Sequence, residues 1–125
     1  MLNRIFKTVI LGVFSLLIIT SITSCKKAKD TIGVIIVKDA NGLTVPGAYV
    51  TLNQDSLISP QGNYTNSDLK KTDYTDVNGR AEFTYELEAI LNVEVQKTDG
   101  NNVYTGSNII RLLKQKTVTK VVVIN

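Results

Sequence analysis

Apolar and polar side chains alternate with a period of two residues along much of the chain. The alternation is clearest in one segment, where Ala81, Phe83, Tyr85 and Leu87 alternate with Glu82, Thr84, Glu86 and Glu88. Successive side chains of a β-strand point to opposite faces of a sheet, so this pattern predicts strands with one buried and one exposed face. No helical period is sustained from residue 31 onward, so we expect an all-β domain.

Turn signals separate the expected strands. Asn41-Gly42, Asn78-Gly79 and Asp99-Gly100 provide the residue types that adopt positive φ angles in tight turns. About seven short strands, each with one exposed face, favour an antiparallel two-sheet sandwich over residues 32–125. The expected strands cover residues 32–38, 48–53, 71–75, 81–88, 91–96, 103–113 and 117–124.

Three segments of the expected sandwich carry a family resemblance. They are Val34-Ile35-Ile36-Val37-Lys38-Asp39-Ala40-Asn41-Gly42, Val45-Pro46-Gly47-Ala48-Tyr49-Val50-Thr51-Leu52 and Thr75-Asp76-Val77-Asn78-Gly79-Arg80-Ala81-Glu82-Phe83. They resemble the carboxypeptidase regulatory-like, or transthyretin-like, β-sandwich superfamily and the related Ig-like repeats of bacterial adhesins. The resemblance implies a domain that holds or presents a partner. The enzymatic branch of the transthyretin-like family relies on active-site histidines, and this chain has none.

The first 24 residues have the organisation of an export signal. Arg4 and Lys7 form a basic start, and an apolar run follows over residues 9–19. A membrane-spanning helix needs about 20 apolar residues, so this run is too short to span. The next segment, Ile22-Thr23-Ser24-Cys25, resembles a bacterial lipobox. The resemblance implies a helical signal peptide over residues 1–24, removed on export, and a lipid on the thiol of Cys25.

Lipidation of Cys25 implies an address and a membrane partner. Residues 25–31 become a short lipidated tether, and two or more acyl chains hold such a protein stably on a membrane. No Asp follows Cys25 directly and no acidic run lies close to it, so we expect the outer membrane, with the domain facing the periplasm. Exposure on the cell surface is the alternative. Lys26, Lys27 and Lys29 either contact anionic headgroups or form a solvated tether.

Charge and composition argue against several classes of function. Two of the 14 basic residues lie in the signal, so 12 basic residues remain against 11 acidic ones, and nucleic-acid binding is not expected. The absence of histidine removes Ser-His-Asp and Cys-His catalysis and His-ligated zinc. We interpret Glu82, Glu86 and Glu88 as the solvated face of one strand. We therefore expect a domain that is not an enzyme and assign no catalytic residue, metal site or cofactor.

A long polar loop over residues 54–70 is a candidate for binding. It contains Leu57, Ile58 and Tyr64, which is more apolar surface than a solvated connection requires. These side chains either bind a partner or fold back over the edge of the sandwich.

Aspartates in turns and hydroxyls after aspartates are the smaller sites. Asp39, Asp76 and Asp99 are explained by turn chemistry, although a weak cation site forms if the turns at one pole converge. Thr31 and Ser56 lie in Asp-Thr-Ile and Asp-Ser-Leu, which resemble an O-glycosylation acceptor of some Gram-negative lineages. Three-residue patterns of this kind also arise by chance.

Three tyrosines complete the candidates. Tyr49, Tyr74 and Tyr104 could stack on sugar or peptide, but in a chain without tryptophan we favour buried or rim positions. The function we expect is that of a cell-envelope lipoprotein whose β-sandwich is a binding or structural module, with an envelope protein or a glycan as partner. The alternative is a surface adhesin or carbohydrate-binding module, which predicts exposed aromatic side chains clustered on one face.

Overall fold

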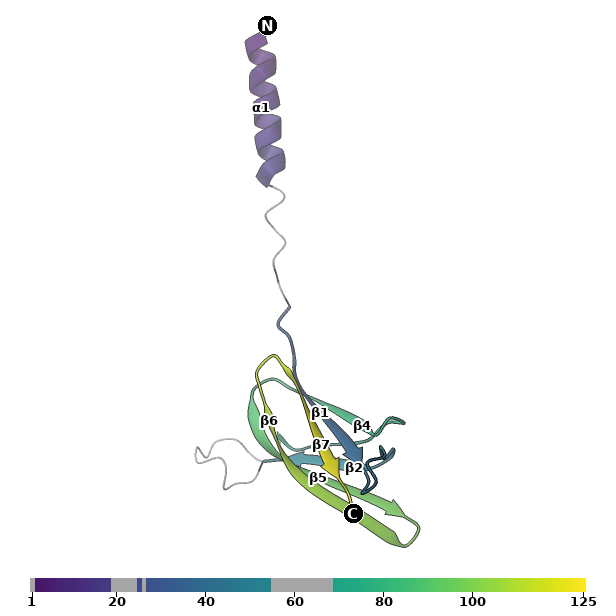
Figure 1. Ribbon diagram of the computed structural model, residues 1–125. Coiled ribbons are helices and arrows are strands. Elements are labelled where there is room, and N and C mark those ends of the chain that lie inside the picture. The colour runs from purple at the N-terminus through teal and green to yellow at the C-terminus, as the bar shows by residue number, and fades with distance from the viewer. Residues whose placement is uncertain (1, 19–24, 26, 55–68) are drawn as a thin grey trace.

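The computed structural model describes residues 2–18, 25, 27–54 and 69–125 (Figure 1). A helix, α1 (Leu2–Ile18), precedes seven strands. Within these ranges no helix combines the length and the apolarity that crossing a bilayer requires. The strands are β1 (Thr31–Lys38), β2 (Tyr49–Asn53), β3 (Lys71–Tyr74), β4 (Arg80–Tyr85), β5 (Ala89–Asp99), β6 (Asn102–Leu112) and β7 (Thr117–Val123).

The strands form two sheets, with the order β4-β1-β7 in one and β3-β2-β5-β6 in the other. This arrangement confirms the predicted all-β sandwich of seven strands in two sheets. Five of the seven expected strands begin and end within one residue of the observed bounds. The agreement is close because glycine, asparagine and aspartate mark the turns between the strands.

One pair of strands departs from the antiparallel arrangement that we expected. β1 and β7 pair in parallel, from Ile32 opposite Thr117 to Lys38 opposite Val123. The turn at residues 113–116 carries the chain from the four-stranded sheet to the three-stranded sheet at the end where β1 begins. β7 therefore starts beside the start of β1 and runs in the same direction.

The two ends of the sandwich carry different segments, and we name them accordingly. The tether pole contains the start of β1, where the chain enters in Figure 1, and the turns at residues 86–88 and 113–116. The far pole contains Asn125 and the turns at residues 39–47, 75–79 and 100–101. Every strand runs between these two poles, so the position of a residue along its strand shows which pole it lies nearer to.

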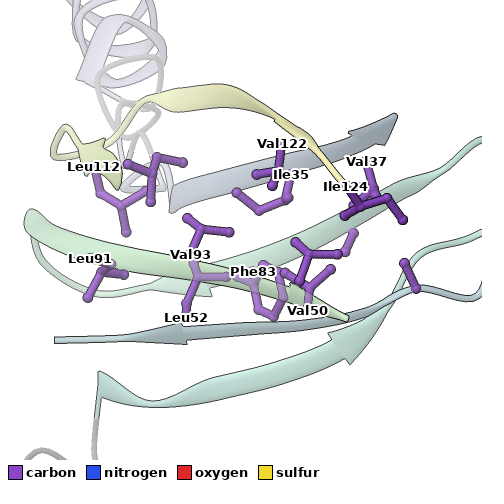
Figure 2. Close-up of a cluster of buried hydrophobic side chains, with 14 of the residues drawn as sticks. Ile35, Val37, Val50, Leu52, Phe83, Leu91, Val93, Leu112, Val122 and Ile124 are labelled. Atoms are coloured by element: carbon purple, nitrogen blue, oxygen red, sulfur yellow. The ribbon is translucent and has the colours of Figure 1, made fainter. Parts of the chain in front are cut away.

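The core lies between the sheets and consists largely of the side chains that the alternation predicts to be buried. Figure 2 shows side chains of the two sheets pointing toward one another, with Ile35 and Val122 on one side and Val50 and Val93 on the other. Burying one such aliphatic side chain contributes about 1.5–3 kcal/mol to stability. The fully buried members include Ile35, Val37, Ala48, Val50, Leu52, Leu91 and Val93.

Tyr85 and Leu87 have different environments, although both were expected to face the core. Tyr85 is buried, and its hydroxyl donates to the Leu69 carbonyl oxygen at 3.0 Å. Burial raises the pKa of Tyr85 to about 12. Leu87 is 57% exposed, so the expectation of a core position is wrong for it. β4 ends at Tyr85, and the chain then bends toward β5 and turns the Leu87 side chain outward.

Two turns of the far pole share one geometry. The Oδ1 atom of Asp39 accepts hydrogen bonds from the backbone N–H groups two and four residues later, both at 2.9 Å. The Oδ1 atom of Asp76 makes the same two contacts, at 2.9 and 3.0 Å. Gly42 and Gly79 follow with φ angles of 83° and 71°, which L-residues with a side chain rarely adopt. Each Asp-x-Asn-Gly segment is thus a structural turn, as its sequence predicts.

The open sides of the sandwich are bridged where the two sheets approach each other. On one side, Thr105 of β6 and Asn125 exchange two backbone hydrogen bonds, at 3.1 and 3.2 Å. On the other side, Lys71 Nζ of β3 donates to the Thr84 carbonyl oxygen of β4. These contacts leave the outer faces of the two sheets as the extended surfaces available to a ligand.

Candidate functional site

Polar and aromatic side chains form rows across the outer face of the sheet β3-β2-β5-β6. Strand register places Tyr74, Tyr49, Gln96 and Thr105 side by side across the four strands. In a strand every second residue shares a face, so the neighbouring row on this face lies two residues along each strand. That row consists of Thr72, Thr51, Glu94 and Ser107.

Tyr49 and Tyr74 form an exposed aromatic pair at the β3 side of this face. Their ring centroids lie 5.1 Å apart, with an angle of 53° between the ring planes. Tyr49 is 38% exposed and Tyr74 is 63% exposed. Tyr74 is not buried but lies on β3, the edge strand of the sheet, which agrees with the rim position that we considered, and Tyr49 also offers part of its ring to solvent. Cross-strand pairing places the two rings together, because Tyr49 and Tyr74 are direct partners in the β2–β3 register.

A shallow groove extends from Tyr49 across the middle of the sheet. It has a volume of about 580 Å³, and its lining includes Thr51, Glu94, Gln96 and Ser107. Hydroxyl, amide and carboxylate groups of this kind can donate or accept several hydrogen bonds to a polar ligand. Among the described residues that line the groove, Glu94 is the one acidic or basic side chain, so these residues contribute a single negative charge. We call the groove and the tyrosine pair together the tyrosine face.

A second cavity, of about 380 Å³, lies at the far pole. Its lining includes Asp39, Lys97, Asp99 and Tyr104, so Tyr104 is separate from the tyrosine face. Two of these polar side chains, those of Asp39 and Lys97, already make hydrogen bonds within the fold. Asp39 caps its own turn, and Lys97 Nζ donates to the backbone carbonyl oxygens of residues 46 and 47 at 3.0 and 3.2 Å.

The far pole brings two of the three turn aspartates together. Asp39 and Asp99 line the same cavity, whereas Asp76 does not. Across the part of the chain that the structure describes, no group of three or more His, Cys, Asp or Glu residues is placed to hold a metal ion. Turn capping is the role that the contacts of Asp39 and Asp76 support.

The other candidate residues are dispersed. Cys25 is exposed and has a free thiol. Leu57, Ile58 and Tyr64 of the candidate binding loop lie outside the described residues, and so does Ser56. Thr31 is only 1% exposed, and its Oγ1 atom accepts a hydrogen bond from the Gln115 backbone N–H at 2.9 Å. The Thr31 hydroxyl is thus buried in the fold and does not present an acceptor for a glycan.

The three glutamates that we interpreted as one strand face do not share a strand. Glu82 lies in β4 and forms an exposed ion pair with Arg80, with 2.9 Å between Nη2 and Oε2. Glu86 and Glu88 follow the end of β4 in the bend at the tether pole. All three are exposed, so the interpretation as solvated carboxylates holds while their common strand does not.

Sequence reasoning identified Tyr49 and Tyr74 but missed the groove beside them. The groove residues occur as ordinary outward positions of separate strands, such as Thr51, Glu94 and Gln96. Only the strand order and register bring them together. The alternation within one strand does not show that β2 pairs with β5, which lies far from it in the sequence. The pairing of two exposed tyrosines was equally dependent on register.

No known protein family and no curated protein matches this sequence. The resemblance to the carboxypeptidase regulatory-like superfamily therefore stays a prediction. Solved structures share the fold. One is the dioxygenase domain of a dioxygenase carbohydrate-binding protein fusion from Streptomyces sp. SirexAA-E, with 12% identity, a TM-score of 0.51 and coverage of 82% of this chain and 83% of that domain.

Two further structures have lower TM-scores. Catechol 1,2-dioxygenase from Acinetobacter sp. ADP1 is 18% identical, with a TM-score of 0.43, and the match covers 67% of this chain but only 37% of the enzyme. A candidate carbohydrate-binding protein from Pseudomonas aeruginosa is 10% identical, with a TM-score of 0.47 and coverage of 80% of this chain and 92% of that chain. This chain thus spans about a third of the catechol dioxygenase.

These neighbours correct one expectation. We expected a domain that is not an enzyme, and this expectation does not stand, because a dioxygenase domain is built on the same sandwich. The reasoning failed because it treated the fold as a sign of a binding or spacer role, whereas one fold serves many functions. At this level of identity the likeness assigns no reaction to the chain. The comparisons establish the fold, and that fold is a two-sheet β-sandwich.

Proposed function

We propose that the protein is a lipid-anchored module of the cell envelope that binds a neutral glycan on its tyrosine face. The observation that carries the proposal is the exposed pair Tyr49–Tyr74 beside a groove of hydrogen-bonding side chains. An exposed aromatic pair on one face is what the carbohydrate-binding alternative predicts.

The chemistry of the face suits a sugar chain. Tyrosine rings offer flat apolar surface for the C–H faces of sugar rings, and their hydroxyls can bond to water or ligand. Thr51, Gln96 and Ser107 provide donors and acceptors for sugar hydroxyls along the groove. The groove is shallow and lies along the sheet, so an extended oligosaccharide fits it better than a small compact ligand, which usually occupies an enclosed pocket.

The charge of the face favours a neutral glycan. Glu94 lies in the central row of the groove, where it can accept hydrogen bonds from sugar hydroxyls. The same carboxylate repels the acid groups of an anionic polysaccharide. A neutral chain of hexose or pentose units meets no such repulsion, and it is the ligand class that we propose.

Binding to defined polysaccharides tests the glycan proposal. The probes are a neutral mixed-linkage β-glucan, galactomannan and dextran, with polygalacturonate as the anionic comparison. We expect binding to at least one neutral probe, and an affinity lowered on the order of tenfold in Tyr74→Ala, for the loss of about 1.4 kcal/mol of ring contact. Tyr104→Ala is the matched control because Tyr104 lines the far-pole cavity. Equal losses in both variants, or no binding to any neutral probe, would refute the proposal.

The anchor is proposed from the lipobox resemblance and the exposed thiol of Cys25. Replacing Cys25 by alanine removes the sulfur atom to which a diacylglyceryl group would be bonded. We expect Cys25→Ala to lose incorporation of a labelled fatty acid and to leave the membrane fraction while the sandwich stays folded. Ser24→Ala is the control because it keeps the cysteine. Labelled, membrane-bound Cys25→Ala protein would contradict the anchor. Fractionation of the wild-type protein tests the proposed address, the outer membrane with the sandwich in the periplasm.

A further inference from the structure

The turn at residues 113–116 is fastened to the point where the chain enters the sandwich. The backbone N–H of Gln115 donates to Thr31 Oγ1 at 2.9 Å, and the N–H of Ile32 donates to the Lys116 carbonyl oxygen at 3.0 Å. Lys116 N–H closes the turn on the Leu113 carbonyl oxygen at 3.1 Å. The turn and the tether are therefore held together at one pole.

This arrangement gathers basic side chains around the tether. Lys27, Lys29 and Lys116 line one shallow cavity with Gln115, and Lys114 lies in the same turn. All four lysines are exposed. Acidic side chains are also present at this pole, namely Asp30 beside the lysines and Glu86 and Glu88 in the bend that follows β4.

Two apolar side chains project from the same pole. Leu113 is 37% exposed in the turn after β6, and Leu87 is 57% exposed in the bend after β4. Leu113 is followed by Lys114, whereas Leu87 lies between Glu86 and Glu88. An exposed leucine beside lysines, as at Leu113, matches a membrane interface, because the apolar group enters the headgroup boundary while the ammonium groups stay at the lipid phosphates. At the far pole, Asp39 and Asp76 lie in turns and Asp99 ends β5, and Lys97 lines the same cavity as Asp39 and Asp99.

The length of the tether adds a geometric constraint, which rests on the anchor proposed at Cys25. Six residue steps separate Cys25 from Thr31, and an extended chain reaches at most about 3.6 Å per residue, or roughly 20 Å. The tether pole is therefore confined close to the bilayer. Charges on a protein surface attract lipid headgroups over about 8 Å at physiological ionic strength. This distance is shorter than the reach of the tether, so the tether lets the lysines come close enough to the headgroups to be attracted.

We propose that the tether pole docks on anionic phospholipid, with Leu113 at the headgroup boundary and the lysines at residues 27, 29, 114 and 116 against the lipid phosphates. Docking gives the lipid-anchored sandwich a fixed orientation, with β1 and β7 directed away from the bilayer. The tyrosine face then stands at the side of the domain, open to a ligand that runs along the membrane. Each lysine contributes about a fivefold preference for an anionic surface over a neutral one.

A single tryptophan introduced by substitution can report on this orientation, because the natural sequence contains no tryptophan whose fluorescence would interfere. The mature lipidated protein is reconstituted in vesicles of phosphatidylethanolamine and phosphatidylglycerol, or of phosphatidylcholine alone, with brominated acyl chains as quenchers. L113W places the reporter at the tether pole, and V77W places it at the far pole, where Val77 is 85% exposed. L87W is a second reporter at the tether pole, used if L113W fails to fold.

We expect L113W fluorescence to shift to shorter wavelength and to be quenched in the anionic vesicles, and V77W fluorescence to stay unchanged. K114Q combined with K116Q should lower the ratio of docked to undocked protein, obtained from the quenching of L113W, about fivefold for each lysine replaced, while the protein still floats with the vesicles. Equal quenching at both poles, or no quenching of L113W and L87W in floating protein, overturns the docking proposal. Protein that does not float contradicts the anchor instead, so the two failures are distinguishable.

Discussion

Gly106 of β6 lies directly against the Val123 carbonyl oxygen of β7, so close that a Cβ atom at position 106 would overlap with that oxygen. The neighbouring backbone pair, Thr105 and Asn125, joins the two sheets through its two hydrogen bonds. A glycine is therefore required where the edge of one sheet meets the edge of the other, and the reason is space, because its φ is not in the left-handed region.

Gly106→Ala should destabilise the sandwich by about 1–3 kcal/mol, because the backbone of Val123 cannot yield as a side chain could. Urea unfolding measures the change. Gly33→Ala is the matched control, since its Cβ would meet the ends of two side chains, Leu112 at 2.9 Å and Ile110 at 3.5 Å, and no backbone atom. A Gly106→Ala protein as stable as the wild type would show that β6 and β7 do not approach in this way.

Thr75→Val should lower stability by about 1–3 kcal/mol, because it leaves a buried donor unpaired. Thr75 is 5% exposed, and its Oγ1 atom accepts from the Ala48 N–H at 2.8 Å while donating to the Val45 carbonyl oxygen at 2.7 Å. Thermal unfolding followed by circular dichroism measures the loss. Thr75→Ser keeps the hydroxyl and should lose much less. Equal losses in the two variants would show that the Thr75 hydroxyl is not what stabilises this position.

Asp76→Ala should cost about 1–2 kcal/mol, since two backbone N–H groups of the far-pole turn lose their acceptor. Asp76→Asn retains an oxygen in the same place and should stay close to the wild type. Chemical denaturation of the two variants provides the comparison. If Asp76→Asn were as destabilised as Asp76→Ala, the negative charge would matter more than the hydrogen bonds.

Tyr85 should make the protein sensitive to alkaline pH. Its pKa is raised to about 12 by burial, above the usual value near 10, so the folded state disfavours tyrosinate. The resulting stabilisation is complete below pH 10 and is lost as the pH rises from about 10 to 12. Unfolding free energies measured across that range should fall in the wild type and fall less steeply in Tyr85→Phe. An identical slope in both proteins would contradict the buried position of the Tyr85 hydroxyl.

The strands were predictable where the local pattern is decisive. Asn41-Gly42 and Asn78-Gly79 mark turns because their geometry depends on residues within the turn itself, and Phe83 alternates with exposed neighbours in a way that only a strand explains. Leu87 misled the same reasoning, because the alternation continues in sequence after the strand has ended. An alternation with a period of two residues does not show the residue at which β4 stops pairing with β1.

The candidate site was less predictable because it depends on register between distant segments. Tyr49 was visible as an outward residue, but its neighbours Tyr74 and Gln96 come from two other strands. The parallel pairing of β1 with β7 was equally hidden, since it follows from the pole at which the chain changes sheets. Such relationships arise from the connection of elements, which single-strand periodicity does not contain.

The parallel pairing of β1 with β7 has a mechanical consequence. A force applied between Thr31 at the start of β1 and the far end of β7 would pull the two strands past each other along their length. The hydrogen bonds of a parallel pair are evenly spaced, so those from Ile32 to Lys38 would share the load and would have to break together. Strands peeled apart from one end lose these bonds one at a time. Pulling on these two ends therefore loads β1 and β7 in shear, a geometry that resists extension better than peeling does.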